Sequence, residues 1–184
     1  NIFEDVIKKN FPESICELQK VSIWHQGMLV FYSGIGGDAI VNFNIRSPKS
    51  MFKMWIDDVT MEEMVKTDFR HALLLNPGFE TGEIDGVPYG WSDKYSFYLR
   101  DFAGISAFSS IDETVFRSGK QSLRIDCLQD AVWCITSDTR ILQSDVVYTA
   151  SLYAKTNKED TKIRIGLRGV DEPVVSEPWN SPLV

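Results

Sequence analysis

Few of the reactive side chains in this sequence have the neighbours that catalysis requires. The two histidines and three cysteines are too few, and too irregularly spaced, to build a Cys/His zinc site or a disulfide scaffold. His25 has no Ser or Cys nucleophile close to it in the pattern, so a catalytic triad is not indicated. The many carboxylates fall on expected strands, where spacing identifies no pair held across a cleft, as glycoside hydrolysis requires. We therefore expect no catalytic site.

Two further motifs have simple structural explanations. Cys127 and Cys134 could pair across a hairpin, but buried free thiols are the favoured interpretation. Gly34-Ile35-Gly36-Gly37 superficially resembles a phosphate-binding loop, yet no helical pattern follows it. A hairpin turn is therefore expected at these glycines.

The charge balance excludes some classes of partner. The 184 residues include 19 Lys and Arg against 26 Asp and Glu, for a formal net charge of −7. Proteins that bind nucleic acids or anionic membranes need clustered Lys and Arg, and no such cluster is visible. The sequence also lacks a run of about 18 or more apolar residues to span a bilayer. The length suits one domain or two small ones, and aromatic residues make up 12%, with five Trp.

Hydrophobic residues alternate with polar ones along most of the chain, which is typical of half-buried β-strands. The alternation is clearest at 39–46, 52–57, 123–127, 148–155 and 162–168. Further strands are expected near 24–32, 95–100, 104–110 and 113–117. Helical spacing is found only in the first 20 residues and in the segment 62–70. Many short strands at regular spacing predict an all-β antiparallel sandwich or barrel.

Four motifs, taken in order, resemble a known family. They are Asn76-Pro77-Gly78-Phe79-Glu80-Thr81-Gly82, Gly90-Trp91-Ser92, Ser118-Gly119-Lys120-Gln121-Ser122-Leu123 and Tyr148-Thr149-Ala150-Ser151-Leu152-Tyr153-Ala154-Lys155. Together they resemble the opening two-thirds of a carbohydrate-binding module of the family 4/9/16/22 group. Residues 1–64, which include a Trp-containing strand and Ile56-Asp57-Asp58-Val59, resemble the closing third. The resemblance implies an antiparallel β-sandwich of the jelly-roll, galactose-binding type.

The order of these segments is reversed relative to the family. The closing segment, 1–64, precedes a connector at 65–74 and the opening segment, 75–184. One hypothesis is a single, circularly permuted sandwich, because incomplete sheets with unpaired edges would be completed within the chain or by a neighbour. The other is a piece of a longer protein that ends one module and begins the next. Neighbouring domains, or a second copy that completes the sandwich, are then the expected protein partners.

The resemblance also implies a structural calcium ion. In the family, the ion lies where the first strand, the Ser-Gly-Lys turn and the last strand meet. The corresponding ligands here are Glu80, the backbone carbonyl of Lys120, and Asp57 or Asp58. Calcium takes six to eight oxygen ligands of these kinds. The alternative is that Asp57 and Asp58 simply form a polar strand end.

Binding of a polysaccharide or oligosaccharide would depend on exposed aromatic rings, because pyranose C–H groups stack on a π face. Trp133 follows a polar turn, and Trp179 lies in a Pro-rich loop. Trp55 shares a strand face with charged residues, so we expect it outside the core, whereas Trp91 is expected to be structural. The candidate carbohydrate-binding residues are Trp133, Trp179, Tyr95, Tyr98, Arg100 and Trp55.

The sequence thus favours a non-catalytic carbohydrate-binding module, accessory to a glycan-degrading enzyme. By resemblance, such a protein would be extracellular or attached to the cell surface. An alternative is a structural or adhesive module that binds neighbouring domains and not sugar. Whether the exposed aromatic side chains gather in one groove distinguishes the two.

Overall fold

A computed structural model gives the fold of the chain. The structure describes residues 13–18, 21–33, 36–46, 51–64, 69–70, 73–84, 87–92, 107–127, 132–159 and 161–169. All of the regular elements in these ranges are β-strands, and no helix in them is long and apolar enough to cross a membrane. The prediction of an all-β antiparallel sandwich is confirmed.

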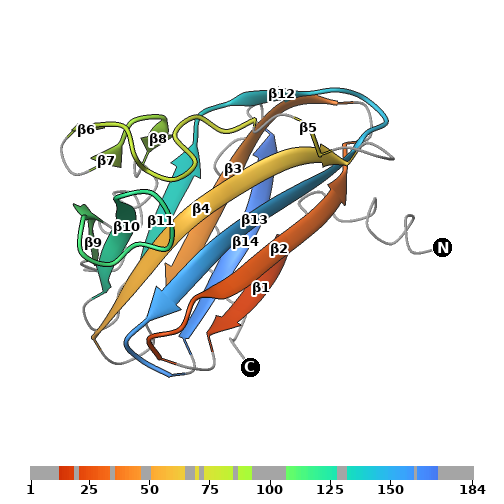
Figure 1. The fold of residues 1–184 in the computed structure, drawn as a ribbon. Helices are drawn as coiled ribbons and strands as arrows, with labels where there is room; N and C mark the ends of the chain where they lie inside the picture. Colours follow the sequence, from red (N-terminus) through yellow and green to blue (C-terminus); the bar gives the residue numbers. More distant parts are fainter. Residues whose placement is uncertain are drawn as a thin grey trace.

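The strands form two larger sheets, which we call sheet A and sheet B, and a small hairpin (Figure 1). Sheet A consists of β1 (Glu13–Leu18), β14 (Thr161–Gly169), β3 (Gly37–Arg46), β11 (Val132–Ser137) and β8 (Trp91–Ser92), in that order, with β12 (Arg140–Leu142) paired to β3. Sheet B consists of β2 (His25–Tyr32), β13 (Val147–Thr156), β4 (Phe52–Met64), β10 (Ser122–Cys127) and β9 (Ala107–Asp112), with β5 (Phe69–Arg70) paired to β4. The hairpin joins β6 (Glu83–Ile84) to β7 (Val87–Pro88).

Strands from before and after the 65–74 connector alternate within both sheets. In sheet A, β3 lies between β14 and β11, and in sheet B, β4 lies between β13 and β10. All of these pairings are antiparallel, and that of β4 with β13 extends from Met54 to Glu63. The central strand of each sheet therefore comes from the segment that resembles the end of a module, and its neighbours come from the later segment.

Two local predictions differ from the structure. The helix expected at 62–70 is wrong for the residues that are described, because β4 continues to Met64 and β5 pairs back onto it. Met61 and Ala150 are cross-strand partners, so burial between sheets explains the apolar spacing. The strand expected at 113–117 is a loop. The helical spacing near the N-terminus, which Phe11-Pro12 ends, and the strand at 95–100 lie outside the described residues.

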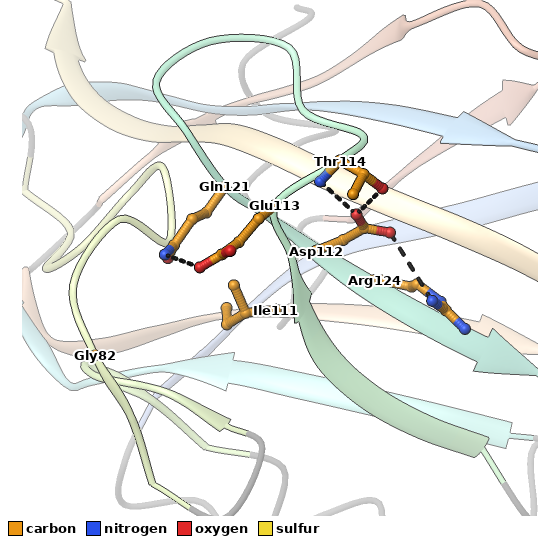
Figure 2. Close-up of a pocket in the computed structure, with 7 residues that line it drawn as sticks. All are labelled: Gly82, Ile111, Asp112, Glu113, Thr114, Gln121 and Arg124. Carbon is orange, nitrogen blue, oxygen red and sulfur yellow. Dashed lines mark hydrogen bonds and ion pairs between the residues drawn. The ribbon is translucent and has the colours of Figure 1, made fainter.

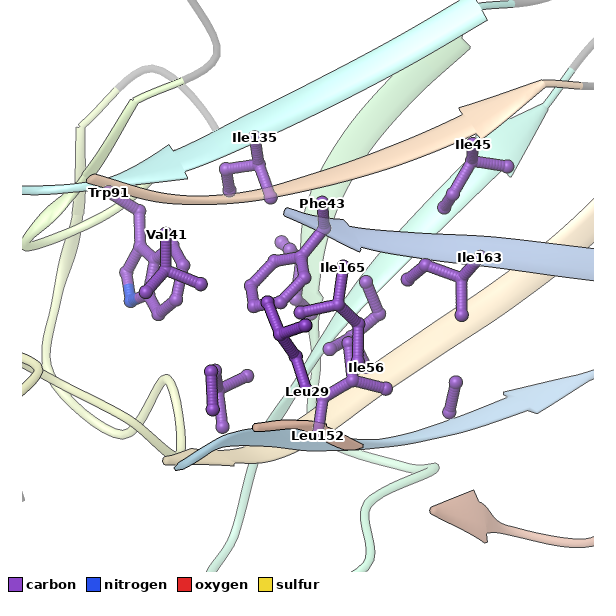
Figure 3. Packing of buried hydrophobic residues seen from close by; sticks show 14 of the residues in the cluster. Leu29, Val41, Phe43, Ile45, Ile56, Trp91, Ile135, Leu152, Ile163 and Ile165 are labelled. Carbon is purple, nitrogen blue, oxygen red and sulfur yellow. The ribbon is translucent and has the colours of Figure 1, made fainter. Parts of the chain in front are cut away.

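The core fills the space between the two sheets (Figure 3). Val41, Phe43 and Ile45 of β3 alternate toward the core, as the two-residue period requires. Phe43 lies against Trp91, with ring centroids 5.7 Å apart, and Trp91 packs on Phe79 at 5.3 Å. Trp91 is only 6% exposed, which confirms its predicted structural role. The core therefore includes residues of the first two family-like motifs.

Candidate functional site

Asp57 is a fully buried carboxylate that organises one end of the sandwich. Its Oδ2 accepts hydrogen bonds from the backbone N–H groups of Arg117, at 2.7 Å, and Ser118, at 3.2 Å. Its Oδ1 accepts a third, from the N–H of Asp58 at 2.7 Å. Asp58 has a φ of 48°, and the register of β4 with β13 shifts here, so the strand bends at this point. The bend places the two carboxylates beside the segment 113–121, which we call the 113–121 loop.

Two other carboxylates hold the ends of the same loop. Oδ1 of Asp112 accepts the N–H groups of Thr114, at 2.8 Å, and Val115, at 3.0 Å. Oε1 of Glu80 accepts the N–H groups of Lys120, at 2.9 Å, and Gln121, at 3.1 Å. With Asp57, these carboxylates satisfy six backbone donors of a loop that has no strand partner. This replaces sheet pairing as the means of ordering the loop backbone.

The family-like motifs explain why Glu80 reaches the loop. Asn76 has a φ of 48°, and its amide side chain bonds to the backbone of Thr81 and Tyr89, which closes a tight turn. Phe79 anchors that turn in the core, so the next side chain, Glu80, points to the loop. Gly119 has a φ of 67°, and a Cβ there would lie 2.0 Å from Glu80 Oε1. Glycine is therefore required for both its backbone conformation and this close approach.

Burial and hydrogen bonding shift the pKa values of Asp57 and Asp112 in opposite directions. Burial raises the pKa of Asp57 above its ordinary value, although three backbone N–H donors act in the opposite direction. Burial also acts to raise the pKa of Asp112, but hydrogen bonds from Thr114, Trp55 and Val115 outweigh it and lower that pKa to about 2. Asp112 is therefore a charged anchor of the loop at every physiological pH.

The residues predicted to bind calcium do come together, but they do not form a cage of oxygen ligands. Asp57 faces three N–H donors, and Asp58 is bound by the Arg117 guanidinium and the Ser118 hydroxyl. Among the residues that the structure describes, no three His, Cys, Asp or Glu side chains are grouped so as to hold a metal ion. Calcium takes six to eight oxygens, which this donor set does not offer as it stands. The calcium ion therefore stays a prediction of the family resemblance, which the arrangement of these donors does not itself favour.

The outer face of sheet B carries a row of alternating cationic and aromatic side chains next to this loop. Arg124 of β10 pairs with Trp55 of β4, and Trp55 pairs with Lys155 of β13. The Lys155 ammonium lies 5.9 Å from the ring of Trp24, which immediately precedes β2. All four side chains are partly exposed. We call these four residues the Trp24–Arg124 row.

A hollow of about 570 Å³ lies at the Arg124 end of the row (Figure 2). It is lined by Gly82, Ile111, Asp112, Glu113, Thr114, Gln121 and Arg124. The Trp55 indole N–H donates to Asp112 Oδ2 at 2.8 Å, so the loop anchor also fixes the orientation of this ring. Arg124 bonds to Asp126 at 2.7 Å, but its buried Nε has no hydrogen-bond partner among the described residues. Polar groups and an aromatic ring thus meet at one place on the surface.

The structure places only some of the predicted carbohydrate-binding residues. Trp55 lies outside the core, as predicted from the charged residues on its strand face. Trp133 belongs to β11 of sheet A, where it pairs with Ile45, and its side chain lies outside what the structure describes. The other four candidates, Tyr95, Tyr98, Arg100 and Trp179, lie entirely outside the described residues.

Trp24 was not among the predicted residues, although it begins a recognisable strand pattern. Its position opposite Lys155 depends on the pairing of β2 with β13, whose partners are more than 100 residues apart in the chain.

The predicted free thiol is confirmed for Cys127, which is buried, and burial raises the pKa of that thiol to about 12. Cys127 is therefore inert near neutral pH.

Sequence comparisons identify no relative. The chain matches none of the protein-family models, and a search of curated proteins also gave no match. The resemblance to carbohydrate-binding modules therefore rests on the four motifs. Asn76, Phe79, Glu80 and Gly119, which belong to those motifs, have defined structural roles at this end of the sandwich.

Replacing Asp57 by Ala tests the role of the buried carboxylate. The substitution leaves three N–H groups without their acceptor, so we expect the free energy of unfolding to fall by about 2–4 kcal/mol. Urea denaturation followed by circular dichroism measures the change. Glu113→Ala is the matched control, because Glu113 lies on the same loop but is exposed, and it should change stability by less than about 0.5 kcal/mol. Equal effects of the two substitutions would contradict the role of Asp57.

The pKa of Asp112 predicts how stability depends on pH. Because its folded-state pKa is lowered from 3.8 to about 2, its contribution is fully present above the ordinary pKa and is lost as pH falls through about 2. In Asp112→Asn this part of the acid dependence should disappear, giving a shallower loss of stability between these pH values. Thermal unfolding of both proteins across the acid range measures the difference. Parallel curves would show that Asp112 titrates normally.

Chelation tests whether calcium contributes to the same corner. Since the carboxylates already accept N–H and guanidinium donors, we expect the melting temperature to be the same in EGTA as in excess calcium. Differential scanning calorimetry on protein purified without chelators provides the measurement, with magnesium as the control ion. A rise of several degrees specific to calcium would instead support the ion implied by the family resemblance.

Proposed function

We propose that the protein is a non-catalytic carbohydrate-binding module that holds a polysaccharide or oligosaccharide against the outer face of sheet B. The observation that carries the proposal is the Trp24–Arg124 row, in which two Trp rings alternate with two cations on a half-exposed strand face. The rings offer stacking surfaces to pyranose C–H groups, and the neighbouring polar groups offer hydrogen bonds to hydroxyls.

The spacing of the two rings suits an extended sugar chain. Trp24 and Trp55 are two strands apart, which corresponds to roughly 10 Å across the sheet. This span is comparable to that of a disaccharide unit, so both rings could stack on the same chain. The indole N–H of Trp55 is fixed by Asp112, and ordering a ring before binding reduces the entropy lost when the ligand arrives.

Polar groups at the Arg124 end supply directional contacts. The hollow presents Thr114 and Gln121 with the carboxylates of Asp112 and Glu113. Asp126 holds the Arg124 guanidinium beside this hollow, 4.0 Å from Asp112, so the polar groups there have fixed positions. Small-molecule sites combine apolar surface with a few polar groups in this way.

The carboxylates beside the row favour binding over catalysis. Asp112 accepts hydrogen bonds from Trp55, Thr114 and Val115, and its lowered pKa keeps it ionised, which is unsuited to a general acid. Asp126 is paired with Arg124 and Lys53. By the family resemblance, we further propose that the module belongs to an extracellular or surface-attached protein and is an accessory to a glycan-degrading enzyme.

One observation favours the alternative, a structural or adhesive module. Met28 and Val30 are 54% and 47% exposed. They belong to β2, which is an edge strand of sheet B among the described residues. Ile23, next to the row, is 50% exposed. A contact with a neighbouring domain would cover these apolar side chains. This alternative requires no sugar, so binding to polysaccharide separates it from the main proposal.

The substitution Trp24→Ala tests sugar binding without touching the core. It removes one stacking surface, so we expect affinity to fall about 5- to 150-fold, by analogy with the stacking of a nucleic-acid base on an aromatic ring, which contributes about 1–3 kcal/mol. Affinity gel electrophoresis on xylans and β-glucans measures it. Trp55→Phe should show a smaller loss, because the ring remains while its bond to Asp112 is removed.

Tyr89→Ala serves as the control for these variants. Tyr89 is 54% exposed but lies in the turn after β7 and contributes no side chain to the row. The Tyr89→Ala variant should therefore be retarded in the polysaccharide gel as much as the wild-type protein. Failure of the wild-type protein to be retarded by any polysaccharide would reject the proposed function and favour the structural alternative.

A further inference from the structure

We propose that Lys155 forms a subsite for a carboxylate group on the bound glycan, so that the preferred ligand is a largely neutral polysaccharide with uronic acid substituents. The proposal rests on the proposed function, because it assigns a ligand class to the same face of sheet B. It adds a charged group to a recognition mode otherwise based on stacking.

Lys155 differs from Lys53 and Arg124, two other cations of this face, in its contacts with carboxylates. Lys53 and Arg124 both contact Asp126, at 3.8 Å and 2.7 Å, and Arg124 also approaches Asp112 at 4.0 Å. The charges of these two residues are therefore already compensated. The ammonium of Lys155, in contrast, contacts no carboxylate of the described residues, and its one neighbour of note is the Trp24 ring.

Lys155 occupies a central position in the Trp24–Arg124 row. It lies on β13, between Trp55 on β4 and Trp24 beside β2. It is partly buried, which reduces the solvation of its charge and strengthens its attraction to an anion relative to a fully exposed lysine. An anion bound at Lys155 would thus lie between the two stacking surfaces.

A uronic acid carries its carboxylate at the edge of the pyranose ring, roughly in the ring plane. A ring stacked on Trp24 can therefore be turned so that this group points along the sheet surface to Lys155, whose ammonium lies 5.9 Å from the centroid of the Trp24 ring. In that orientation Lys155 would donate a charge-assisted hydrogen bond to the carboxylate.

The net charge limits how many such groups the ligand can carry. With a formal charge of −7, the protein repels densely charged polyanions at long range. A single local cation is therefore better matched to sparse acidic substituents, as in glucuronoxylan, than to a polymer of uronic acids. The same local interaction should weaken as salt increases.

The experiment compares glucuronoxylan with the same polysaccharide after chemical reduction of its carboxyl groups. Binding by isothermal titration calorimetry is measured for wild type, Lys155→Ala, Lys155→Arg and the control Lys158→Ala, which removes a lysine from the adjacent turn. We expect the wild type to bind the acidic form about tenfold more tightly at low salt. Lys155→Ala should abolish that preference, whereas Lys155→Arg and Lys158→Ala should retain it.

The outcomes separate this inference from the proposed function. Equal binding of the acidic and reduced polysaccharides by the wild type would overturn the Lys155 subsite and leave carbohydrate binding intact. A preference that persists in Lys155→Ala would place the anion at another residue and would also overturn it. No binding of either polysaccharide would reject the proposed function itself, and with it the subsite.

Discussion

The burial of Asp57 is the constraint on which this end of the molecule depends. A carboxylate without solvent requires hydrogen-bond donors, and here the backbone N–H groups of Asp58, Arg117 and Ser118 provide them. The loop cannot move away without leaving the carboxylate unsatisfied, and the strand cannot lose its bend without moving the carboxylate. Strand β4 and the 113–121 loop are thereby fixed to each other, although 60 residues separate Asp57 from Arg117.

That constraint extends to the outer face of sheet B. Asp112 accepts hydrogen bonds from the backbone N–H of Thr114 and from the indole N–H of Trp55. This one side chain therefore fixes both the start of the loop and the orientation of the Trp55 ring. At the other side, the Arg117 guanidinium lies over the Tyr153 ring of β13, 3.5 Å from its centroid. The aromatic groups of this face therefore have orientations fixed by the fold, which is the property a preformed sugar-binding surface needs.

Much of this architecture could be predicted from the sequence, because alternation reports which residues face a core. The strands at 39–46 and 148–155 follow from it directly. The segment 62–70 could not be read in this way, since Met61 and Met64 fit a helical spacing as well as a strand, and only pairing with β13 decides between them. Likewise, residues 113–117 have a strand-like composition, but the N–H groups of the 113–121 loop bond to side-chain carboxylates.

The candidate site was predictable to the extent that motifs encode local contacts. Glu80, Asp57 and the carbonyl of Lys120 were expected to lie at one corner. Glu80 does contact Lys120, but through its N–H group, and the sequence did not show that the carboxylates would accept N–H groups of the loop. Trp24 was missed because its place in the row arises from long-range strand pairing. Composition had suggested only that abundant Trp and few clustered cations suit a glycan partner, whereas the row gives that idea a specific surface.

The central claim is that Trp24 and Trp55 contact sugar on the face of sheet B. Its most direct test is to follow the indole N–H signals of all five Trp by ¹H–¹⁵N NMR while a xylan- or glucan-derived oligosaccharide is added. We predict that the signals of Trp24 and Trp55 shift in a saturable way, while that of the buried Trp91 stays in place. Saturable shifts confined to Trp133 or Trp179, or no shift of any indole signal, would contradict the claim.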